Sequence, residues 1–191
     1  MTNFDYHTPE TASDVAASIL SNIQDNVGFI PNIFALVAES ECALQGLVAL
    51  NSAFNASSFS AQEQQIILLA TSTTNECVYC VAGHTAFSQN LDISNKIIKD
   101  MRDQQPTEIE SFNVLANTVR QLIQGKGRVS SELIKHFFNA GFSKAQFLEL
   151  VMGICVKTFT NYVSNSLSVE LDDAFKPYTW QRPSDTRQQV A

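Results

Sequence analysis

The sequence predicts an all-α protein, and three observations support this fold class. Apolar residues recur three and four positions apart along almost the whole chain, which is the spacing of one face of an α-helix. The 191 residues include only 7 Gly and 5 Pro to interrupt this pattern, and no segment has the strict alternation of a strand. With 45% hydrophobic and 16% charged residues, we expect one globular domain over residues 1–191.

The apolar spacing and the chain breakers together predict a series of helices. Their expected ranges are Ala12–Asp25, Asn32–Ser40, Cys42–Ala56, Ala61–Thr73, Glu76–Ser88, Ile93–Asp103, Glu108–Gln124, Ser131–Ala140 and Lys144–Val169. An N-terminal arm of about residues 1–11 precedes them, and a C-terminal strap of about residues 172–191 follows them. The charges and prolines of the strap indicate an extended segment that ends in disorder, with Trp180 anchored on the body or on a neighbouring subunit.

Several of these helices have a recognisable start or end. A side-chain oxygen at the N-cap and a Glu or Gln three residues later satisfy backbone N–H groups that lack a partner in the helix. Such capping boxes are expected in "SAQE" (Ser60–Glu63), "TEIE" (Thr107–Glu110) and "SKAQ" (Ser143–Gln146). Pro31 suits the first turn of the second helix, and Gly141 follows "FFNA", where the eighth helix should stop.

The chain contains a weak internal repeat. "FSAQE" at Phe59 and "FSKAQ" at Phe142 each open an apolar helix after a turn, and they stand 83 residues apart. We therefore expect a fold built from two related helical halves. At that offset the second half has no cysteine or histidine opposite those of residues 75–88, so only the first half can carry thiol chemistry.

The charge and hydropathy of the chain exclude several classes of partner. A formal net charge of -7 opposes binding to a phosphate backbone, and "GKGR" (Gly125–Arg128), which lacks the spacing of a phosphate loop, is expected to be a polar turn. The N-terminus has no basic start followed by an apolar run, and no stretch approaches the roughly 18 consecutive apolar residues of a membrane span. We therefore expect a cytoplasmic protein that binds neither nucleic acid nor membrane.

The stretch "NECVYCVAGHTAFS" (residues 75–88) carries the candidate site. Cys80 follows Cys77 by three positions and His84 follows Cys80 by four, so one helix face brings them close enough for a disulfide and for thiol-imidazole proton exchange. If Asn75 caps this helix, Cys77 occupies its second position on an exposed opening turn, where the positive helix end favours a thiolate. Cysteines in a reducing compartment indicate redox or metal chemistry rather than structural disulfides.

Two other interpretations of these cysteines stay open. Free cysteine is among the most buried residue types, so the pair could be ordinary core. A zinc site would need further ligands, and Cys42, Cys155, His7 and His136 show no paired spacing with each other. Cys42 and Cys155 are expected in the core. No phosphate-binding glycine motif or haem-attachment signature is present, and we expect neither a cofactor nor a metal.

Three longer stretches resemble the carboxymuconolactone decarboxylase superfamily, and within it the AhpD-like alkylhydroperoxidases and peroxidase-related proteins. They are "NVGFIPNIF", "FSAQEQQIILLATSTTNECVYCVAGH" and "GFSKAQFLELVMGICVKTFTNYVSNSLSVELDDAFKPYTW", and C-x-x-C-x-x-x-H is their most specific element. The resemblance implies an all-helical fold and a homo-oligomer, such as a trimer or a hexamer. It also implies reduction of a hydroperoxide or a disulfide by a cysteine pair, which a thiol donor such as dihydrolipoamide or a redox protein recharges.

The resemblance also assigns roles to individual residues. It makes Cys80 the attacking sulfur, Cys77 the resolving sulfur and His84 the proton carrier, whereas the helix terminus alone would favour Cys77 as the more acidic thiol. The superfamily pattern has a Glu twelve residues before the first cysteine, and here that position is Gln65. An amide can orient an imidazole but cannot carry a proton at neutral pH, and Glu63, two residues away, is expected to face away.

The leading hypothesis is a thiol-dependent peroxidase or disulfide oxidoreductase in antioxidant defence, slowed by the missing carboxylate. One alternative is a lyase like the decarboxylases that name the superfamily, which would not require a cysteine pair. The other alternative is a non-catalytic oligomeric redox sensor. The sequence leaves the substrate, the electron donor and the size of the oligomer open.

Overall fold

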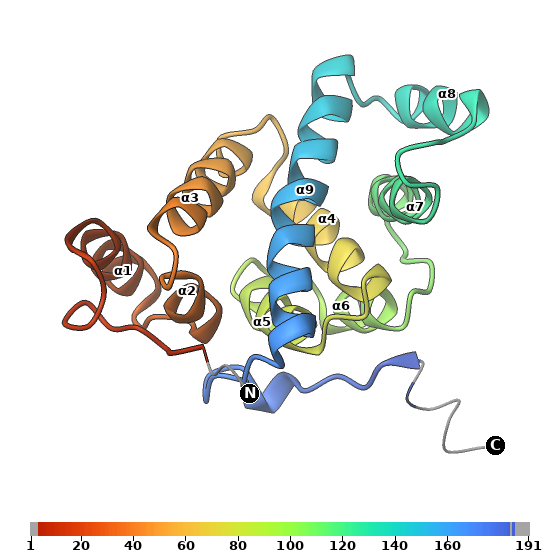
Figure 1. Ribbon diagram of the computed structural model, residues 1–191. Coiled ribbons are helices and arrows are strands. Elements are labelled where there is room, and N and C mark those ends of the chain that lie inside the picture. The colour runs from red at the N-terminus through yellow and green to blue at the C-terminus, as the bar shows by residue number, and fades with distance from the viewer. Residues whose placement is uncertain (1–3, 184, 186–191) are drawn as a thin grey trace.

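The computed structural model describes residues 4–183 and 185, and within them the fold is all-helical, without strands (Figure 1). The helices are α1 (Asp14–Val27), α2 (Asn32–Val37), α3 (Glu41–Asn55), α4 (Ala61–Thr74), α5 (Val78–Gln89), α6 (Asn95–Arg102), α7 (Glu110–Gln124), α8 (Ser131–Asn139) and α9 (Lys144–Leu167), followed by the 3-10 turn η1 (Lys176–Tyr178). The all-α prediction is confirmed, and each expected helix is present with its ends shifted by a few residues. None of the described helices is long and apolar enough to span a membrane.

Helix α4 lies at the centre of the fold, and its whole circumference is buried over residues 66–73. It packs against α5, α6, α7 and α9, and Figure 1 shows α1 to α3 on one side of α9 and α7 and α8 on the other. Thr71, Ser72 and Thr73 each donate to the carbonyl four residues earlier, at 2.8, 2.8 and 3.0 Å. These three hydroxyls are therefore satisfied inside an apolar core.

Two of the three predicted capping boxes are confirmed. At α4, Ser60 Oγ accepts from Glu63 N at 3.3 Å, and Ser60 N donates to the Glu63 carboxylate at 2.8 Å. At α9, Ser143 and Gln146 make the same two bonds at 3.1 and 2.8 Å. Glu63 is thus engaged at the start of α4, as expected. Gly141 has a φ of 97° just after α8, which confirms the predicted helix stop.

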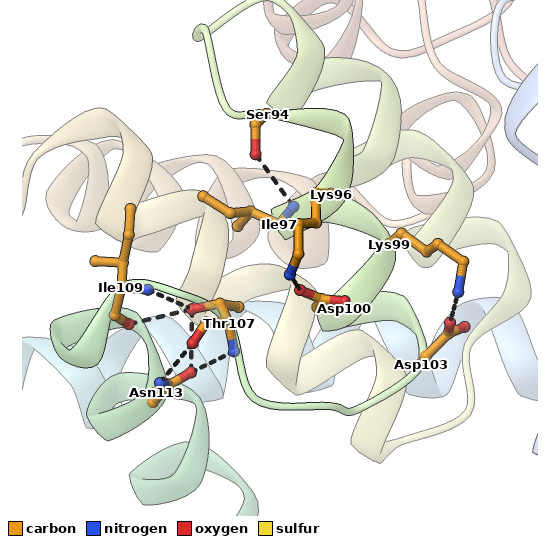
Figure 2. Close-up of polar contacts among 9 residues, drawn as sticks. All are labelled: Ser94, Lys96, Ile97, Lys99, Asp100, Asp103, Thr107, Ile109 and Asn113. Atoms are coloured by element: carbon orange, nitrogen blue, oxygen red, sulfur yellow. Dashed lines mark hydrogen bonds and ion pairs between the residues drawn. The ribbon is translucent and has the colours of Figure 1, made fainter.

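The third capping box, expected in "TEIE", is wrong. Helix α7 begins at Glu110 after Ile109, whose side chain cannot act as a cap. Thr107 N instead donates to Asn113 Oδ1 at 2.7 Å, and Asn113 Nδ2 donates to Thr107 O at 3.0 Å (Figure 2). Because the Asn113 amide satisfies both backbone groups of Thr107, the chain turns there before the helix begins.

The two predicted halves meet at equivalent positions. Phe59 precedes α4 and Phe142 precedes α9, and their ring centroids lie 6.0 Å apart. Asn75 Nδ2, at the end of α4, donates at 3.3 Å to Thr158 of α9, which also stands 83 residues later. If the two halves are related by a nearly two-fold axis, residues 83 positions apart that lie near the axis are expected to contact each other, as these two pairs do. The duplication itself stays a prediction.

The strap after α9 is fixed to α6 by its aromatic side chain. Trp180 is buried, with 7% of its surface exposed, and its Nε1 donates to Arg102 O at 3.2 Å. Arg102 Nη2 donates in return to Thr179 O at 2.8 Å. The anchoring of Trp180 on the body is therefore confirmed. The disorder predicted for the end of the strap falls on residues 184 and 186–191, which lie outside the described residues.

Candidate thiol site

The site begins at the turn between α4 and α5, which differs from the prediction. Helix α4 ends with Asn75 as its C-cap, and Glu76 takes a left-handed φ of 51°. Glu76 N donates to Thr73 O at 3.2 Å, and Cys77 N donates to Ser72 O at 2.9 Å. These are the two bonds of a Schellman motif, which closes a helix and reverses the chain. The expected cap of α5 by Asn75 is wrong, because Asn75 completes the preceding helix.

The turn makes Cys77 the N-cap of α5, so Cys77 is not at its second helical position. Cys77 Sγ accepts a hydrogen bond from Cys80 N at 3.4 Å, and the two thiols also hydrogen-bond to each other without a disulfide. The expectation of an exposed opening turn is wrong, since Cys77 is 0% and Cys80 3% exposed. The pair is buried because α9 and the core around α4 cover the start of α5.

A cavity of about 230 Å³ reaches one of the two sulfurs. Cys80, His84 and Gln65 line it, whereas Cys77 lies behind Cys80 and does not. The remaining lining residues are Val27, Pro31, Ile33, Phe34, Leu47, Asn51, Asn55, Leu68, Tyr79, Gly83, Phe87, Val156, Lys157, Thr160 and Phe175. A small molecule in this cavity therefore meets Cys80 first, although bulk solvent hardly touches the thiol.

His84 and Gln65 form the second part of the site. His84 Nδ1 and Gln65 Oε1 are 2.9 Å apart, which joins the middle of α5 to the first turns of α4. With the amide oxygen facing the ring, Nδ1 carries the hydrogen and Nε2 is left as an acceptor. Burial, and then the charge of Lys157, hold the pKa of His84 well below its usual value. The imidazole is therefore neutral and its Nε2 can accept a proton.

The two thiols are made electrostatically unequal by their partners. Burial raises the pKa of Cys80, but the hydrogen bond with Cys77, the charge of Lys157, and hydrogen bonds with Asn161 and Thr160 outweigh it and lower the pKa to about 6. The hydrogen bond to Cys80 and then burial raise the pKa of Cys77 far above that of an ordinary thiol. The order is thus the reverse of the one that the helix terminus alone suggested. The capping bond from Cys80 N lowers the pKa of Cys77, but the groups that act on Cys80 and the burial of Cys77 outweigh it.

Helix α9 supplies the groups around Cys80 that sequence reasoning missed. Thr160 Oγ1 lies 3.9 Å from Cys80 Sγ, and the buried Asn161 is held by Asn75 Nδ2 at 2.9 Å. Lys157 lines the cavity one turn earlier on the same helix. These residues lie about 80 positions from the cysteines in the chain, and only the 83-residue repeat, which pairs Thr160 with Cys77, relates the two segments.

The strap closes the cavity from the other side. Tyr79 Oη donates to Asp172 Oδ2 at 2.6 Å, and Asn32 N, at the start of α2, donates to Asp172 Oδ1 at 3.0 Å. Burial and then the carboxylate of Asp172 raise the pKa of Tyr79, so the phenol stays a donor. Phe175 then places its ring 5.9 Å from the Tyr79 ring and 5.6 Å from the Phe87 ring, which makes it part of the cavity wall.

The other candidate ligands lie apart from this site. Cys42 and Cys155 were expected in the core, but both are exposed on their helices. His136 is exposed on α8, and His7 in the N-terminal arm bonds Glu39 at 2.8 Å. Within residues 4–183 and 185, no group of three or more His, Cys, Asp or Glu side chains is arranged to hold a metal ion.

The same segment that builds the thiol site matches a known family. Residues 43–105, which contain both cysteines of the pair together with Gln65 and His84, match the carboxymuconolactone decarboxylase family. The matched residues are about a third of the chain, and this segment is similar to that family. A search of curated proteins finds no match to the chain.

Solved structures share the fold over most of the chain. A structure described as the alkylhydroperoxidase AhpD core of an uncharacterized peroxidase-related protein from Ralstonia eutropha JMP134 has a TM-score of 0.81 and 16% identity, covering 92% of this chain and 96% of that chain. An uncharacterized peroxidase-related protein from Silicibacter sp. TM1040 has a TM-score of 0.76 and 16% identity, covering 85% and 87%. The apo debrominase Bmp8 has a TM-score of 0.74 and 13% identity, covering 85% and 89%. The AhpD-like helical fold is thereby confirmed.

Proposed function

We propose that this protein is a dithiol oxidoreductase of the AhpD-like class, which reduces a hydroperoxide or a disulfide in antioxidant defence. The observation that carries the proposal is the inequality of the two sulfurs. Cys80 lines a cavity and has a lowered pKa, whereas Cys77 is its hydrogen-bonding neighbour behind it. A thiolate open to a substrate, backed by a second thiol, is the arrangement that a cysteine pair needs to cycle between dithiol and disulfide.

In the proposed reaction with a hydroperoxide, the Cys80 thiolate attacks the terminal peroxide oxygen. The O–O bond breaks, Cys80 becomes a sulfenic acid, and the departing alkoxide takes a proton from solvent through His84 to leave as the alcohol. Cys77 then attacks the Cys80 sulfur, and the S–S bond forms as the hydroxyl of the sulfenic acid leaves with the Cys77 proton as water. Two electrons from the pair have reduced the peroxide.

The proposed cycle closes when a dithiol donor, such as dihydrolipoamide or a redox protein, reduces the disulfide by thiol-disulfide exchange. His84 fits the role of proton carrier because its imidazole is neutral and buried beside the thiols. Gln65 orients the ring through Nδ1 but cannot take a proton from it. We therefore propose a slower peroxidase than one with a carboxylate at this position. A reducing cytoplasm would keep such a donor available.

We also propose that the protein forms a homo-oligomer, which the superfamily resemblance implies as a trimer or hexamer. Helix α9 supports this with an exposed apolar stripe in which Leu148 is 71%, Phe159 39% and Tyr162 62% exposed. Leu148 and Tyr162 stand seven residues to either side of the exposed Cys155. A two-fold axis at Cys155 would therefore set Leu148 against Tyr162 of the partner subunit, so the stripe is complementary to a second copy of itself.

The cycle is tested by counting free thiols before and after one equivalent of peroxide. We expect the loss of two thiols, a bond between Cys77 and Cys80 located by mass spectrometry, and recovery with a dithiol. Cys77→Ser and Cys80→Ser should each abolish turnover with peroxide and dithiol, whereas Cys42→Ser is the matched control on an exposed thiol. Turnover that survives in both site variants removes the redox mechanism.

Activity assays on the same protein distinguish the lyase and the redox sensor from the proposed oxidoreductase. A lyase would act on a lactone acid, and that activity would persist after the thiols are alkylated. A redox sensor would form the bond between Cys77 and Cys80 reversibly, with negligible turnover from any donor. The proposed oxidoreductase must instead turn over many times per chain.

A further inference from the structure

We propose that Lys157 makes the cavity above Cys80 an anion-selecting site, which favours small substrates with an apolar body and one negatively charged group. If the chain is a peroxidase, as proposed above, the substrate class is a small organic hydroperoxide that carries a carboxylate. The anion preference itself concerns the cavity and does not depend on which reaction Cys80 performs.

The charges that line the cavity are the first observation. Lys157 is half-buried on α9, and no Asp or Glu is among the lining residues. None of the ion pairs within residues 4–183 and 185 involves Lys157, so no carboxylate of the described chain neutralises its ammonium group. His84, the other basic lining residue, is neutral. Among the described lining residues, Lys157 therefore carries the one positive charge, and Cys80, when it is ionised, carries the one negative charge.

The apolar remainder of the wall is the second observation. Phe34, Leu47, Phe87, Val156 and Phe175 surround the space, and the described polar lining groups are mostly amides and hydroxyls. Low polarity around a charge weakens its screening, so the ammonium attracts an anion more strongly than it would at the surface. A volume of about 230 Å³ is below the about 300–1,000 Å³ of sites for drug-sized molecules, which limits the ligand to a small organic molecule.

Lys157 acts on the sulfur as well as on the ligand. Its positive charge helps to lower the pKa of Cys80, so the ammonium group favours the ionised form of the thiol. A substrate anion drawn to the ammonium is consequently held near the attacking sulfur. The net charge of -7 on the whole chain would repel anions from the surface, so a preference for anions has to come from this local charge.

Two alkylating reagents test the anion preference without any turnover. Iodoacetate and iodoacetamide are nearly the same size and differ in charge. Because both react with the thiolate, the ratio of their rates at Cys80 does not depend on the fraction of the thiol that is ionised. The rate of alkylation of Cys80 by iodoacetate is divided by the rate with iodoacetamide, both followed by mass spectrometry. This rate ratio is then divided by the same rate ratio for 2-mercaptoethanol. We expect a value of roughly ten, which corresponds to about one charge-assisted hydrogen bond.

The variants assign this preference to the side chain. In Lys157→Gln the normalised ratio should fall to about one, and in Lys157→Arg it should stay near the wild-type value, because the charge is kept. Lys144→Gln, which removes the same charge from the exposed start of α9, should leave the ratio unchanged. A wild-type ratio of one or less, an unchanged ratio in Lys157→Gln, or no reaction of Cys80 with either reagent would overturn the inference.

Turnover then separates this inference from the proposed function. With cumene hydroperoxide and its para-carboxylate as a matched pair, Lys157→Gln should raise the KM for the carboxylate roughly tenfold relative to the KM for the neutral compound, because the change in the Cys80 pKa affects both compounds alike. If neither compound is turned over but the alkylation ratio depends on Lys157, the proposed peroxidase function is wrong and the proposed anion site stands. Equal KM values for both compounds in the active wild-type protein remove the anion site and keep the peroxidase.

Discussion

Gln65 Oε1 lies 2.9 Å from His84 Nδ1, so an amide orients the imidazole where the superfamily pattern has a carboxylate. The amide fixes the tautomer of the ring and leaves Nε2 as a proton acceptor. Because it carries no negative charge, it stabilises the imidazolium that forms when Nε2 takes a proton less than a carboxylate would. The site therefore has the geometry of a proton relay without its final acceptor.

Gln65→Glu should restore that acceptor and raise the turnover of peroxide. A carboxylate beside Nδ1 raises the pKa of His84 and adds general acid-base assistance, which is typically worth about 10²- to 10⁴-fold; we expect a gain at the lower end because His84 is buried. The measurement is kcat with cumene hydroperoxide and a dithiol. Gln24→Glu adds the same charge on the exposed face of α1 and is the control. No change in kcat would mean that Gln65 does not occupy the relay position.

The lowered pKa of Cys80 predicts the pH dependence of its alkylation. The thiolate is the reactive form, so the rate of reaction with iodoacetamide should rise from pH 4 to a midpoint at about pH 6 and then stay level. Lys157→Gln removes a positive charge that favours the thiolate, and the midpoint should move to higher pH. A midpoint near the ordinary thiol value of about 8.5 in the wild type would contradict the electrostatics described for the site.

The bonds of Asp172 predict a large effect for one of two adjacent aspartates. Asp172→Asn leaves one acceptor oxygen for two donors, Asn32 N and Tyr79 Oη, so one buried donor loses its partner. We expect the free energy of unfolding to fall by about 1 to 3 kcal/mol in urea denaturation. Asp173→Asn removes the same charge from a side chain that is 95% exposed and should change stability by less than about 0.5 kcal/mol. Equal effects of the two variants would contradict a stabilising role for the bonds that Asp172 of the strap makes to Asn32 and Tyr79.

Two glycines on helices should respond in opposite directions to alanine. A Cβ at Gly153 of α9 would lie 2.5 Å from the Phe54 ring, so Gly153→Ala should lower the free energy of unfolding by about 1 to 3 kcal/mol through overpacking. A Cβ at Gly46 meets nothing within 4 Å on the exposed face of α3, and Gly46→Ala should raise it by about 0.5 to 1 kcal/mol. Urea denaturation measures both, and a Gly153→Ala variant as stable as the wild type would contradict the close packing of α3 on α9.

The stripe on α9 predicts an oligomer that a single charge can weaken. Tyr162→Glu should place a carboxylate in the apolar contact and lower the mass found by light scattering at micromolar concentration. Gln121→Glu, on an exposed position of α7, should leave the mass unchanged. A wild-type protein that stays monomeric would remove the proposed contact along α9.

The helices and most of their starts could be predicted from the sequence because the signals are local. The apolar period marks each helix, and the boxes at Ser60 and Ser143 need only residues three positions apart. The turn before α5 could not be predicted in this way. A Schellman motif usually has Gly at its left-handed residue, and here Glu76 takes that conformation, so the sequence shows no sign that Asn75 ends one helix instead of starting the next.

The site was predicted only where its members are neighbours in the chain. Cys77, Cys80 and His84 fall within two turns, and the period of the helix relates them directly. Lys157 and Thr160 come from a helix far along the chain, and they reach the thiol only because α9 packs against α4 and α5. Burial was also mispredicted for Cys155, because the sequence pattern does not show which face of a long helix is left without a neighbour.

Phe175 gives the order in which the cavity can be completed during synthesis. Its ring packs over Gly83 and beside Tyr79, yet it is translated only after the last residue of α9. A chain that ends after Leu167 would contain every helix from α1 to α9 but would lack the Phe175 wall of the cavity around Cys80. Completion of that cavity depends on residues translated after the helices.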